Sequence, residues 1–452
     1  MDQVRHALIA GMGKSGRACA QFLLERNWRV GVTDTRSKPP QALWWKNHLP
    51  EIAVYPDWGT LPLNHFDMIV ASPGIPWDDP VLEQARHNGI SVMGELELFA
   101  RQIKGELIGI TGTNGKSSVT VLLALMAKFS GAHFRAGGNL GRPAIDLLNV
   151  PRPDLYILEL SSFQLESCWS LKPKVAVLLN ITEDHLERHG DMHAYARIKT
   201  NFCRQAQHAI INQDDPWIRD AKMEGGRFIP FSAQTCLPQA RASIVSHGGA
   251  PWIATDGKPL IELSKIGVNG MHQCSNVLAA VSAALIMGWP GSAICQALTL
   301  FKGLSHRMRS IATIEGVNYI DDSKATNPAS TVAAMGQMDQ PYVLIAGGAS
   351  KNSDFMPLLE AANEKLTGVI LMGQEAPRLE NMFSHHSRLC IVRDMKEAVD
   401  QARRWTTPGE AVLLSPACAS LDMFRSYAER GRIFTQHVKR ITTPVLTKAE
   451  CL

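Results

Sequence analysis

Short apolar segments rich in β-branched residues recur along the whole chain and alternate with longer segments of helical periodicity. They run from HALIAG near the N-terminus, through LIGITG and LYILEL, to AVLLSPA near residue 411. Such alternation predicts α/β domains in which parallel sheets are covered by helices. Because ligands bind at the carboxyl ends of the strands in folds of this kind, the polar residues that follow each strand are the candidates for function.

The composition argues against several classes of partner. The net charge is only +4 and no block of consecutive Lys or Arg occurs, so we expect no nucleic-acid partner. The nine cysteines include no Cys-x-x-Cys pair, which favours reduced thiols and the cytosol. The first residues lack the pattern of a signal peptide, and the longest apolar stretch, VLAAVSAALIMGW, falls short of the ~20 residues of a spanning helix. We therefore expect a cytoplasmic protein without membrane insertion.

The first of two glycine loops, GMGKSG, follows the first predicted strand. Gly11, Gly13 and Gly16 have the spacing of a dinucleotide-binding loop, and Asp34 closes the next strand. The same pattern occurs in Rossmann-like turns that hold another nucleotide or none. Lys14 adds a positive charge that suits a diphosphate at the start of the following helix.

The second loop, GITGTNGKSSVT, ends like a P-loop but departs from its spacing. Five residues separate Gly109 from Gly115, where the standard motif has four. Gly112 and Gly115 allow backbone N–H groups to face phosphate oxygens, Lys116 brings a point charge, and the Ser117 hydroxyl can reach a magnesium ion. The apolar helix pattern VTVLLALMAKF follows directly, so the loop predicts a nucleotide site.

Acidic residues that could hold the magnesium ion of such a nucleotide follow the next two strands. Glu159 ends one strand, and Glu183, Asp184 and His185 follow the other. A single acid at a strand end is usually a solvated cap, but two successive strand ends after this loop favour a metal site. The histidines of this segment are spaced four apart and could suggest zinc, yet a glycine interrupts their helix and no familiar ligand set is complete.

Three predicted strands in the last third of the chain also end in polar clusters, within DDSKATN, LIAGGASKNSDF and LLSPACASLDMF. These clusters supply Asp322, Lys324, Lys351 and Ser420, while Arg307 in GLSHRM offers a planar guanidinium suited to phosphate. Clusters at three strand ends of one domain predict a cradle for a small molecule.

The length of 452 residues corresponds to about three domains. Boundaries are expected near SVMGELELFARQIKGEL and FKGLSHRMRSIATIEGV. We predict an N-terminal Rossmann-like domain over residues 1–94, a central P-loop-type ATPase α/β domain over 95–304 and a C-terminal Rossmann-like domain over 305–452.

The motifs resemble those of the Mur ligases, which attach amino acids to the UDP-muramoyl precursor of bacterial peptidoglycan. TGTNGKS, LELSSFQLE, NITEDHLERHG, YARIK, GLSHRM, DDSKATN and LLSPACASLDMF carry the resemblance, and GMGKSG with TDTR extends it to the N-terminus. The family's own loop, T-G-T/S-N-G-K-S/T, accounts for the departure from the standard spacing. DDSKATN and SPACASLDMF look like those of the members that add D-glutamate to UDP-N-acetylmuramoyl-L-alanine.

The resemblance implies a two-step reaction. The carboxylate of UDP-N-acetylmuramoyl-L-alanine attacks the γ-phosphate of ATP to give an acyl phosphate, which the amine of D-glutamate then attacks. The implied cofactors are ATP, two Mg²⁺ ions and a carbamylated Lys199 in YARIK. We expect the enzyme to be a monomer.

The resemblance also implies roles for individual residues. The catalytic residues would be Lys116, Glu159, His185, Lys199, Lys324 and Lys351. ATP would be bound by Gly112, Thr113, Asn114, Gly115, Lys116, Ser117, Ser118, Asn276, Arg307 and Asp322. The metal would be held by Ser117, Glu159, His185 and Lys199, and the substrates by Ser15, Thr35, Arg36, Gly74, Asn139, Thr326, Ser420 and Tyr427. Two positions depart from the family pattern: Gln273 stands where Asn is usual, and Tyr427 where Phe is usual.

Three other functions are open at this stage. An NAD-dependent oxidoreductase would use GMGKSG and Asp34, but it explains nothing after residue 100. A folylpolyglutamate synthase would share the T-G-T-N-G-K loop, but it would not be expected to begin with GMGKSG and TDTR. A non-enzymatic nucleotide-binding scaffold is the third, and it would release no orthophosphate in response to substrates.

Overall fold

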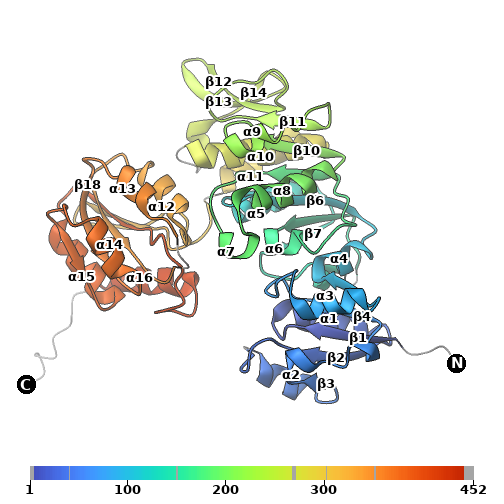
Figure 1. Cartoon of the computed structure of the whole chain (residues 1–452). Helices are drawn as coiled ribbons and strands as arrows, with labels where there is room; N and C mark the ends of the chain where they lie inside the picture. Colours follow the sequence, from blue (N-terminus) through green and yellow to red (C-terminus); the bar gives the residue numbers. More distant parts are fainter. Residues whose placement is uncertain are drawn as a thin grey trace, which may run out of the picture. The chain divides into compact units, whose positions relative to one another are not determined.

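The computed structural model describes residues 5–39, 41–148, 151–266, 271–301, 303–350 and 353–441. The described chain forms three α/β domains, each built around a mostly parallel sheet (Figure 1), so the predicted fold class is confirmed. Internal contacts group the domains into two compact units. The first unit contains the N-terminal and central sheets, and the second contains the C-terminal sheet together with residues 182–187.

The N-terminal sheet has five parallel strands in the order β3-β2-β1-β4-β5. They are β1 (His6–Ala10), β2 (Arg29–Thr33), β3 (Ala53–Tyr55), β4 (Met68–Ala71) and β5 (Ser91–Gly94). Its helices are α1 (Lys14–Leu24), α2 (Ala42–His48) and α3 (Pro80–His87), with the short 3-10 turns η1 (Trp58–Thr60) and η2 (Leu63–His65). Strand order reverses beside β1, so the carboxyl ends of β1 and β4 border the position where such sheets bind ligands.

The central sheet has six parallel strands in the order β11-β10-β9-β6-β8-β7. They are β6 (Glu106–Thr111), β7 (Phe134–Gly138), β8 (Leu155–Glu159), β9 (Val175–Leu178), β10 (His208–Asn212) and β11 (Phe228–Phe231). The helices that follow them are α5 (Lys116–Phe129), η3 (Ile145–Leu148), α6 (Ser162–Leu165), α7 (Leu186–His189), α8 (Met192–Arg204) and α9 (Pro216–Asp220). The inner strands β8 and β9 are buried on both faces, which explains their continuous apolar runs.

A small antiparallel sheet follows the central one. Its strands are β12 (Ala242–His247), β13 (Ala250–Thr255) and β14 (Lys258–Glu262), followed by η4 (Leu263–Lys265). The chain then continues through α10 (Met271–Ile286) and α11 (Gly291–Leu300), and α11 packs against α5. This sheet was not predicted from the sequence, because its strands are half exposed and lack long apolar runs.

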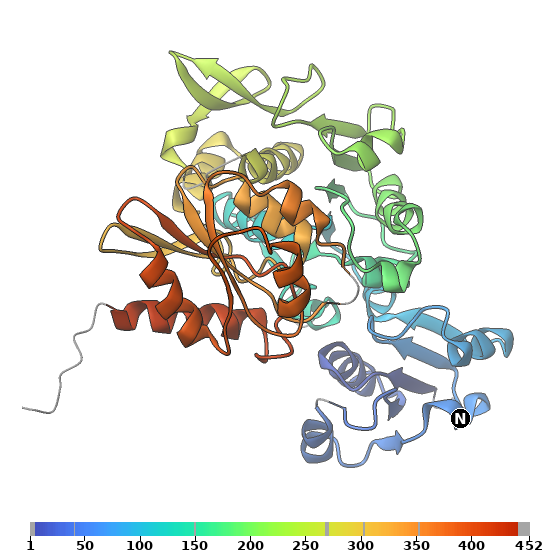
Figure 2. The same cartoon turned by 60° about the vertical axis from the view of Figure 1, so that its left-hand side comes forward.

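The C-terminal sheet has the order β15-β16-β20-β17-β18-β19, and β15 alone is antiparallel to its neighbour. Its strands are β15 (Arg309–Ile314), β16 (Val317–Asp321), β17 (Tyr342–Ala346), β18 (Leu366–Leu371), β19 (Leu389–Ile391) and β20 (Ala411–Leu414). Its helices are α12 (Pro328–Met335), α13 (Met356–Glu360), α14 (Ala376–Met382), α15 (Met395–Trp405) and α16 (Tyr427–Ile441). The first three helices pack on one face and the last two on the other, a sandwich that can be followed in Figure 2.

The N-terminal and central domains share one continuous hydrophobic core. The helix α4 (Glu95–Ala100) leads from one sheet to the other. Glu95 Oε1 accepts the Ile145 N–H at 2.8 Å, and Glu97 accepts the N–H groups of Trp169 and Ser170 at 2.9 Å. These buried carboxylates accept backbone donors and so fix the connecting helix α4 against the central domain.

None of the described helices is both long and apolar enough to cross a bilayer.

Candidate active site

The glycine loop of the central domain joins β6 to α5. Gly112 and Gly115 have φ values of +148° and +85°, conformations that L side chains rarely adopt. Gly115 is the N-cap of α5, and no side chain caps this helix start. The first N–H groups of α5 are therefore directed toward the loop, where the helix dipole favours an anion.

Asn180, directly beyond β9, holds the loop in shape. Its backbone carbonyl accepts the Thr113 N–H at 2.9 Å, its Oδ1 accepts the Asn114 N–H at 2.7 Å, and its Nδ2 donates to the Asn114 carbonyl at 3.1 Å. The Thr113 and Tyr195 hydroxyls lie 3.1 Å apart. Asn180 was not predicted as a site residue, although it begins the motif NITEDH.

Lys116 folds over the same loop. Its Nζ donates to the carbonyls of Gly112 and Thr113, both at 2.8 Å. The ammonium is thereby held at the centre of the loop. Ser117, the next residue of α5, is buried, and Ser118 is half-buried.

Asn276 of α10 lies against this loop. A Cβ atom placed on Gly115 would be 2.3 Å from Asn276 Oδ1, so only glycine fits there. The predicted nucleotide contact Asn276 is therefore beside the phosphate loop although it lies 161 residues further along the chain. Gln273 lies one turn earlier on the same helix and is half-buried.

Glu159 occupies the carboxyl end of β8, beside the start of the loop, because it is in register with Ile110 of β6. Its Oε1 accepts Asn139 Nδ2 at 2.7 Å. Its Oε2 is buried and has no hydrogen-bond partner among the described residues. A buried carboxylate oxygen without a donor is costly, so the position fits a cation.

Lys199 on α8 is 1% exposed and faces the loop from the other side. Its Nζ donates to the Gly112 carbonyl at 3.2 Å and lies 4.5 Å from the centroid of the Tyr195 ring. His185, the remaining predicted metal ligand, belongs to the second unit, whereas Ser117, Glu159 and Lys199 belong to the first. In the described ranges, no group of three or more His, Cys, Asp or Glu side chains could hold a metal ion.

The GMGKSG loop of the N-terminal domain joins β1 to α1, and Asp34 lies beside it. Asp34 Oδ2 accepts the Met12 N–H at 2.7 Å, and Arg36 binds both carboxylate oxygens at 2.8 and 2.9 Å. Burial raises the pKa of Asp34, but hydrogen bonds from Arg36 and Met12 lower it further, to below its ordinary value. The acid that would read a dinucleotide ribose is thus already engaged by protein donors.

The other predicted residues of this domain lie at the carboxyl end of the same sheet. Ser15 is in the first turn of α1, and Thr35 and Arg36 follow β2. Gly74 is in the exposed turn after β4, where Ser72 Oγ lies 3.4 Å from the Gly11 carbonyl. The residues predicted for the uridine diphosphate are therefore gathered around one loop.

Asp322 is the most perturbed acid of the C-terminal domain. Its Oδ2 accepts the Ser415 hydroxyl at 2.8 Å, and its Oδ1 accepts the Met308 N–H at 3.1 Å. Burial raises the pKa of Asp322 to about 7. Arg307 exerts an opposing electrostatic effect on the same carboxyl.

The other described residues predicted for this domain lie in the clusters after β16 and β20 and at the start of α16. Lys324 Nζ lies 4.0 Å from the centroid of the Tyr427 ring, and Thr326 is half-buried close by in the chain. Ser420 is buried in the segment after β20. Lys351, the sixth predicted catalytic residue, lies outside the described residues.

Arg430 connects these clusters and was not predicted. Its buried guanidinium donates to Ser323 Oγ at 3.0 Å, to the Ser323 carbonyl at 2.9 Å and to the Cys418 carbonyl at 3.1 Å. Burial lowers the pKa of Arg430 to about 10. The only signal in the sequence is that this arginine lies on the apolar face of α16. In every other respect it looks like an ordinary surface arginine.

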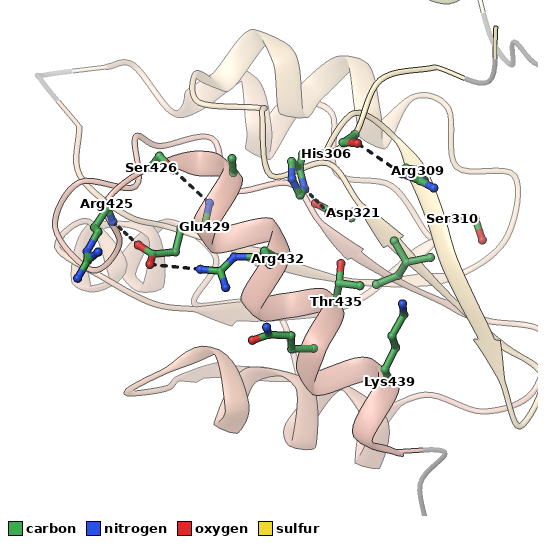
Figure 3. Close-up of a pocket in the computed structure, with 14 residues that line it drawn as sticks. His306, Arg309, Ser310, Asp321, Arg425, Ser426, Glu429, Arg432, Thr435 and Lys439 are labelled. Atoms are coloured by element: carbon green, nitrogen blue, oxygen red, sulfur yellow. Dashed lines mark hydrogen bonds and ion pairs between the residues drawn. The ribbon is translucent and has the colours of Figure 1, made fainter. Parts of the chain in front are cut away.

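A groove of about 750 Å³ lies between β15 and α16, and Figure 3 shows the side chains that line it. Its charged lining includes Arg309, Arg425, Arg432 and Lys439, with His306 and Asp321 paired at 2.6 Å. Asp321 of the DDSKATN cluster is among its lining residues, but none of the residues assigned above to catalysis, ATP, metal or substrates is.

The fold and these sites define a multidomain α/β enzyme class in which a phosphate loop and a nucleotide-type N-terminal loop lie on separate sheets. The chain belongs to the Mur ligase family. The MurD-like N-terminal domain model matches residues 5–94, the middle domain model matches 110–284, and the glutamate ligase domain model matches 306–418.

The curated relatives match over nearly their whole length. The UDP-N-acetylmuramoylalanine--D-glutamate ligase of Nitrosococcus oceani is 38% identical, and the alignment covers 96% of this chain and 96% of that protein. The protein of the same name from Methylococcus capsulatus is 36% identical over 98% of this chain and 96% of its own.

Solved structures at lower identity share the fold. The UDP-N-acetylmuramate-alanine ligase of Thermotoga maritima aligns with a TM-score of 0.62 at 16% identity, covering 97% of this chain and all of that one. The MurF ligase of Thermotoga maritima, solved in complex with ADP, aligns with a TM-score of 0.59 at 16% identity over 97% and 96% of the two chains.

Proposed function

We propose that the chain is an ATP-dependent ligase that adds D-glutamate to UDP-N-acetylmuramoyl-L-alanine, with release of ADP and orthophosphate. The observation that carries this proposal is the phosphate loop braced by Asn180 with the partnerless Glu159 oxygen beside it, in a chain whose full-length relatives bear that ligase name. The competing oxidoreductase would require a free ribose-binding acid, whereas Asp34 is bound to Arg36.

The loop residues would bind the ATP phosphates. Gly112, Thr113, Asn114, Gly115, Ser117 and Ser118 would surround the phosphate oxygens, and Lys116 would exchange its two loop carbonyls for phosphate oxygens. Asn276 borders the same loop, while Arg307 and Asp322 would contact the nucleotide from the C-terminal domain. Positioning and charge stabilisation are the main tasks of a protein in phosphoryl transfer.

Magnesium fits this site because Glu159 presents a buried carboxylate oxygen without a donor. Glu159, Ser117, His185 and a modified Lys199 would hold two ions. When bound, the metal supplies charge neutralisation between the γ-phosphate and the attacking carboxylate. Asn139 fixes the Glu159 carboxylate through Oε1, and it would also contact the muramoyl substrate.

We further propose that Lys199 is carbamylated. A fully buried ammonium is costly and would repel a metal ion. Addition of CO₂ to the uncharged amine forms an N–C bond and releases one proton, which yields an anionic group with two oxygens. Oxygen anions are the ligands that magnesium prefers.

The substrates would occupy the other two domains. Ser15, Thr35, Arg36 and Gly74 would bind the uridine diphosphate at the start of α1. Lys324, Lys351, Thr326, Ser420 and Tyr427 would bind D-glutamate and the acyl phosphate. The amine of D-glutamate would attack the acyl carbon, phosphate would leave, and the amine would lose a proton to form the amide.

We also propose the domain limits 1–94, 95–304 and 305–452, a monomeric state and a cytoplasmic location, where ATP and the nucleotide-linked substrate would both be available. The proposal is tested by measuring orthophosphate release from the purified chain. Release should require ATP, UDP-N-acetylmuramoyl-L-alanine, D-glutamate and Mg²⁺ together. Orthophosphate release that does not depend on the UDP substrate or on D-glutamate would contradict the proposal.

A further inference from the structure

Arg188 of the central domain forms a largely buried ion pair within that domain and also donates a hydrogen bond to the N-terminal domain. Its side chain is 13% exposed and pairs with Glu166, whose side chain is 11% exposed. Arg188 Nε donates to Glu166 Oε1 at 3.0 Å, and Arg188 Nη2 donates to the same oxygen. Nη2 also donates at 2.7 Å to the backbone carbonyl of Ile75, which is 113 residues away in the sequence.

Ile75 closes the turn that follows β4. Its N–H donates to the Ser72 carbonyl at 3.0 Å, and Ser72 Oγ lies 3.4 Å from the Gly11 carbonyl in the GMGKSG loop. A Cβ atom on Gly11 would lie 2.5 Å from Ser72 Oγ, so turn and loop are in direct contact. Arg188 therefore ties the turn at one edge of the site that we assign to the uridine diphosphate to the central domain.

Glu166 connects Arg188 to the strand that carries Glu159. The helix α6 begins two residues after β8 with a complete capping box at Ser161, and Glu166 is its C-cap. His189 braces the same helix: its Nε2 lies 2.9 Å from Ser162 Oγ, and its Nδ1 lies 3.3 Å from Glu166 Oε2. Polar contacts thus lead from α6, which follows β8 in the chain, through His189, Glu166 and Arg188 to the turn after β4.

The geometry points to Arg188 as a positioning residue that sets the distance between the uridine diphosphate site and the carboxylate Glu159. The inference rests on the proposed function, in which the substrate spans both domains: its diphosphate lies at the GMGKSG loop and its reacting carboxylate near Glu159. A displacement of about 1 Å at the reacting atoms can lower a rate about 100-fold. Removing the Arg188 side chain should therefore impair the binding and reaction of the whole substrate, which spans both domains, more than the binding of either part of it alone.

The test compares Arg188→Ala and Arg188→Lys with the wild-type chain. Titration calorimetry with UDP, with UDP-N-acetylmuramoyl-L-alanine and with ATP is combined with kcat for ligation. For Arg188→Ala we expect affinities for UDP and ATP within about twofold of wild type, and a kcat reduced at least about tenfold, with weaker binding of the whole substrate. Arg188→Lys keeps the positive charge but lacks the planar guanidinium, so it should restore part of the lost kcat and substrate affinity. It also replaces the alanine variant if that variant does not fold.

Arg101→Ala is the matched control, because Arg101 pairs with Glu97 at the same domain junction but does not touch the Ile75 turn. It should leave kcat and all three affinities within about twofold of wild type. The inference is overturned if the Arg188 variants keep wild-type kcat, if Arg101→Ala loses as much, or if UDP alone loses affinity equally. Wild-type chain that binds no UDP-N-acetylmuramoyl-L-alanine would instead refute the proposed function.

Discussion

Asn139 and Glu159 are joined by two hydrogen bonds. The Asn139 backbone N–H donates to the Glu159 carbonyl at 2.8 Å, and the side-chain amide donates to Glu159 Oε1 at 2.7 Å. The carboxylate is thereby fixed at the end of β8, while its second oxygen is buried with no hydrogen-bond partner in the described chain. Such an oxygen is stabilised by a cation, which gives the first prediction.

Glu159→Gln should weaken the use of magnesium. The amide keeps the shape of the side chain but removes the negative charge that a hard cation requires. We expect the Mg²⁺ concentration for half-maximal orthophosphate release to rise at least about tenfold, which corresponds to about 1.4 kcal/mol. Glu106→Gln, which changes an exposed acid on β6, serves as control. Unchanged magnesium dependence of the Glu159 variant would contradict the assignment.

Lys116→Ala should abolish orthophosphate release and leave the binding of UDP-N-acetylmuramoyl-L-alanine nearly unchanged. The lysine is held over the phosphate loop, whereas the UDP site is assigned to another domain. Lys128→Ala, at an exposed position in the last turn of the same helix, should behave like wild type. A Lys116 variant that retains more than about a tenth of the rate, a loss under ~1.4 kcal/mol, would show that the role is wrong.

Lys199→Ala should be nearly inactive, and short carboxylic acids should restore part of its rate by supplying the missing oxygen ligand. The wild-type chain should show the added mass of one CO₂ at neutral pH, when measured under conditions that preserve carbamates. Arg197→Ala changes an exposed residue of the same helix and should keep activity without any acid. Detection of unmodified lysine in an active, magnesium-loaded chain would refute the modification.

The N-terminal loop should bind UDP and not NAD. A ligand that binds the native state raises its melting temperature, so UDP-N-acetylmuramoyl-L-alanine should shift the melt of the full chain while NAD should not. The reason is that both oxygens of Asp34 are occupied by Arg36 and Met12. A larger shift with NAD would restore the oxidoreductase interpretation.

Glu95 should make folding less favourable as the pH rises. Burial raises the pKa of Glu95 to about 7. The pKa of Glu95 in the folded protein exceeds the unfolded value of about 4.3. Its contribution to stability is therefore complete below pH ~4.3, and it is lost progressively as the pH rises from there to about 7. The loss is roughly 4 kcal/mol at most, since the pKa is raised by ~2.7 and each pKa unit corresponds to about 1.36 kcal/mol.

Glu95→Gln does not titrate, so its stability relative to wild type should rise between pH 5 and pH 7.5. Chemical denaturation of both proteins at the two pH values measures the difference, and comparison with wild type cancels other titrating groups such as Asp322. A stability difference that is the same at both pH values would mean that Glu95 titrates normally.

The sequence predicts the parts of the site that are local in the chain. Strand, glycine turn and helix follow one another around Gly112 and Lys116, and the same is true of the GMGKSG loop, so spacing and periodicity suffice. The family resemblance extends the prediction to Asn276, which lies beside Gly115 only because α10 packs against the loop.

Contacts between distant segments could not be predicted in this way. Asn180 braces the loop from 66 residues away, Arg188 reaches Ile75 over 113 residues, and Arg430 reaches Ser323 over 107. Each of these side chains is an ordinary polar residue within its own segment. Its role arises from the packing of two sheets or helices, which a single sequence does not encode in any local pattern.

The central claim is tested most directly by mass spectrometry of the product formed from UDP-N-acetylmuramoyl-L-alanine, ATP, Mg²⁺ and a panel of single amino acids. The proposed function predicts one new amide, formed with D-glutamate alone, together with ADP and orthophosphate in equal amounts. L-glutamate, L-lysine, diaminopimelate and L-alanine should give no product. Ligation of another amino acid in preference to D-glutamate, or no ligation with any of them, would contradict the account.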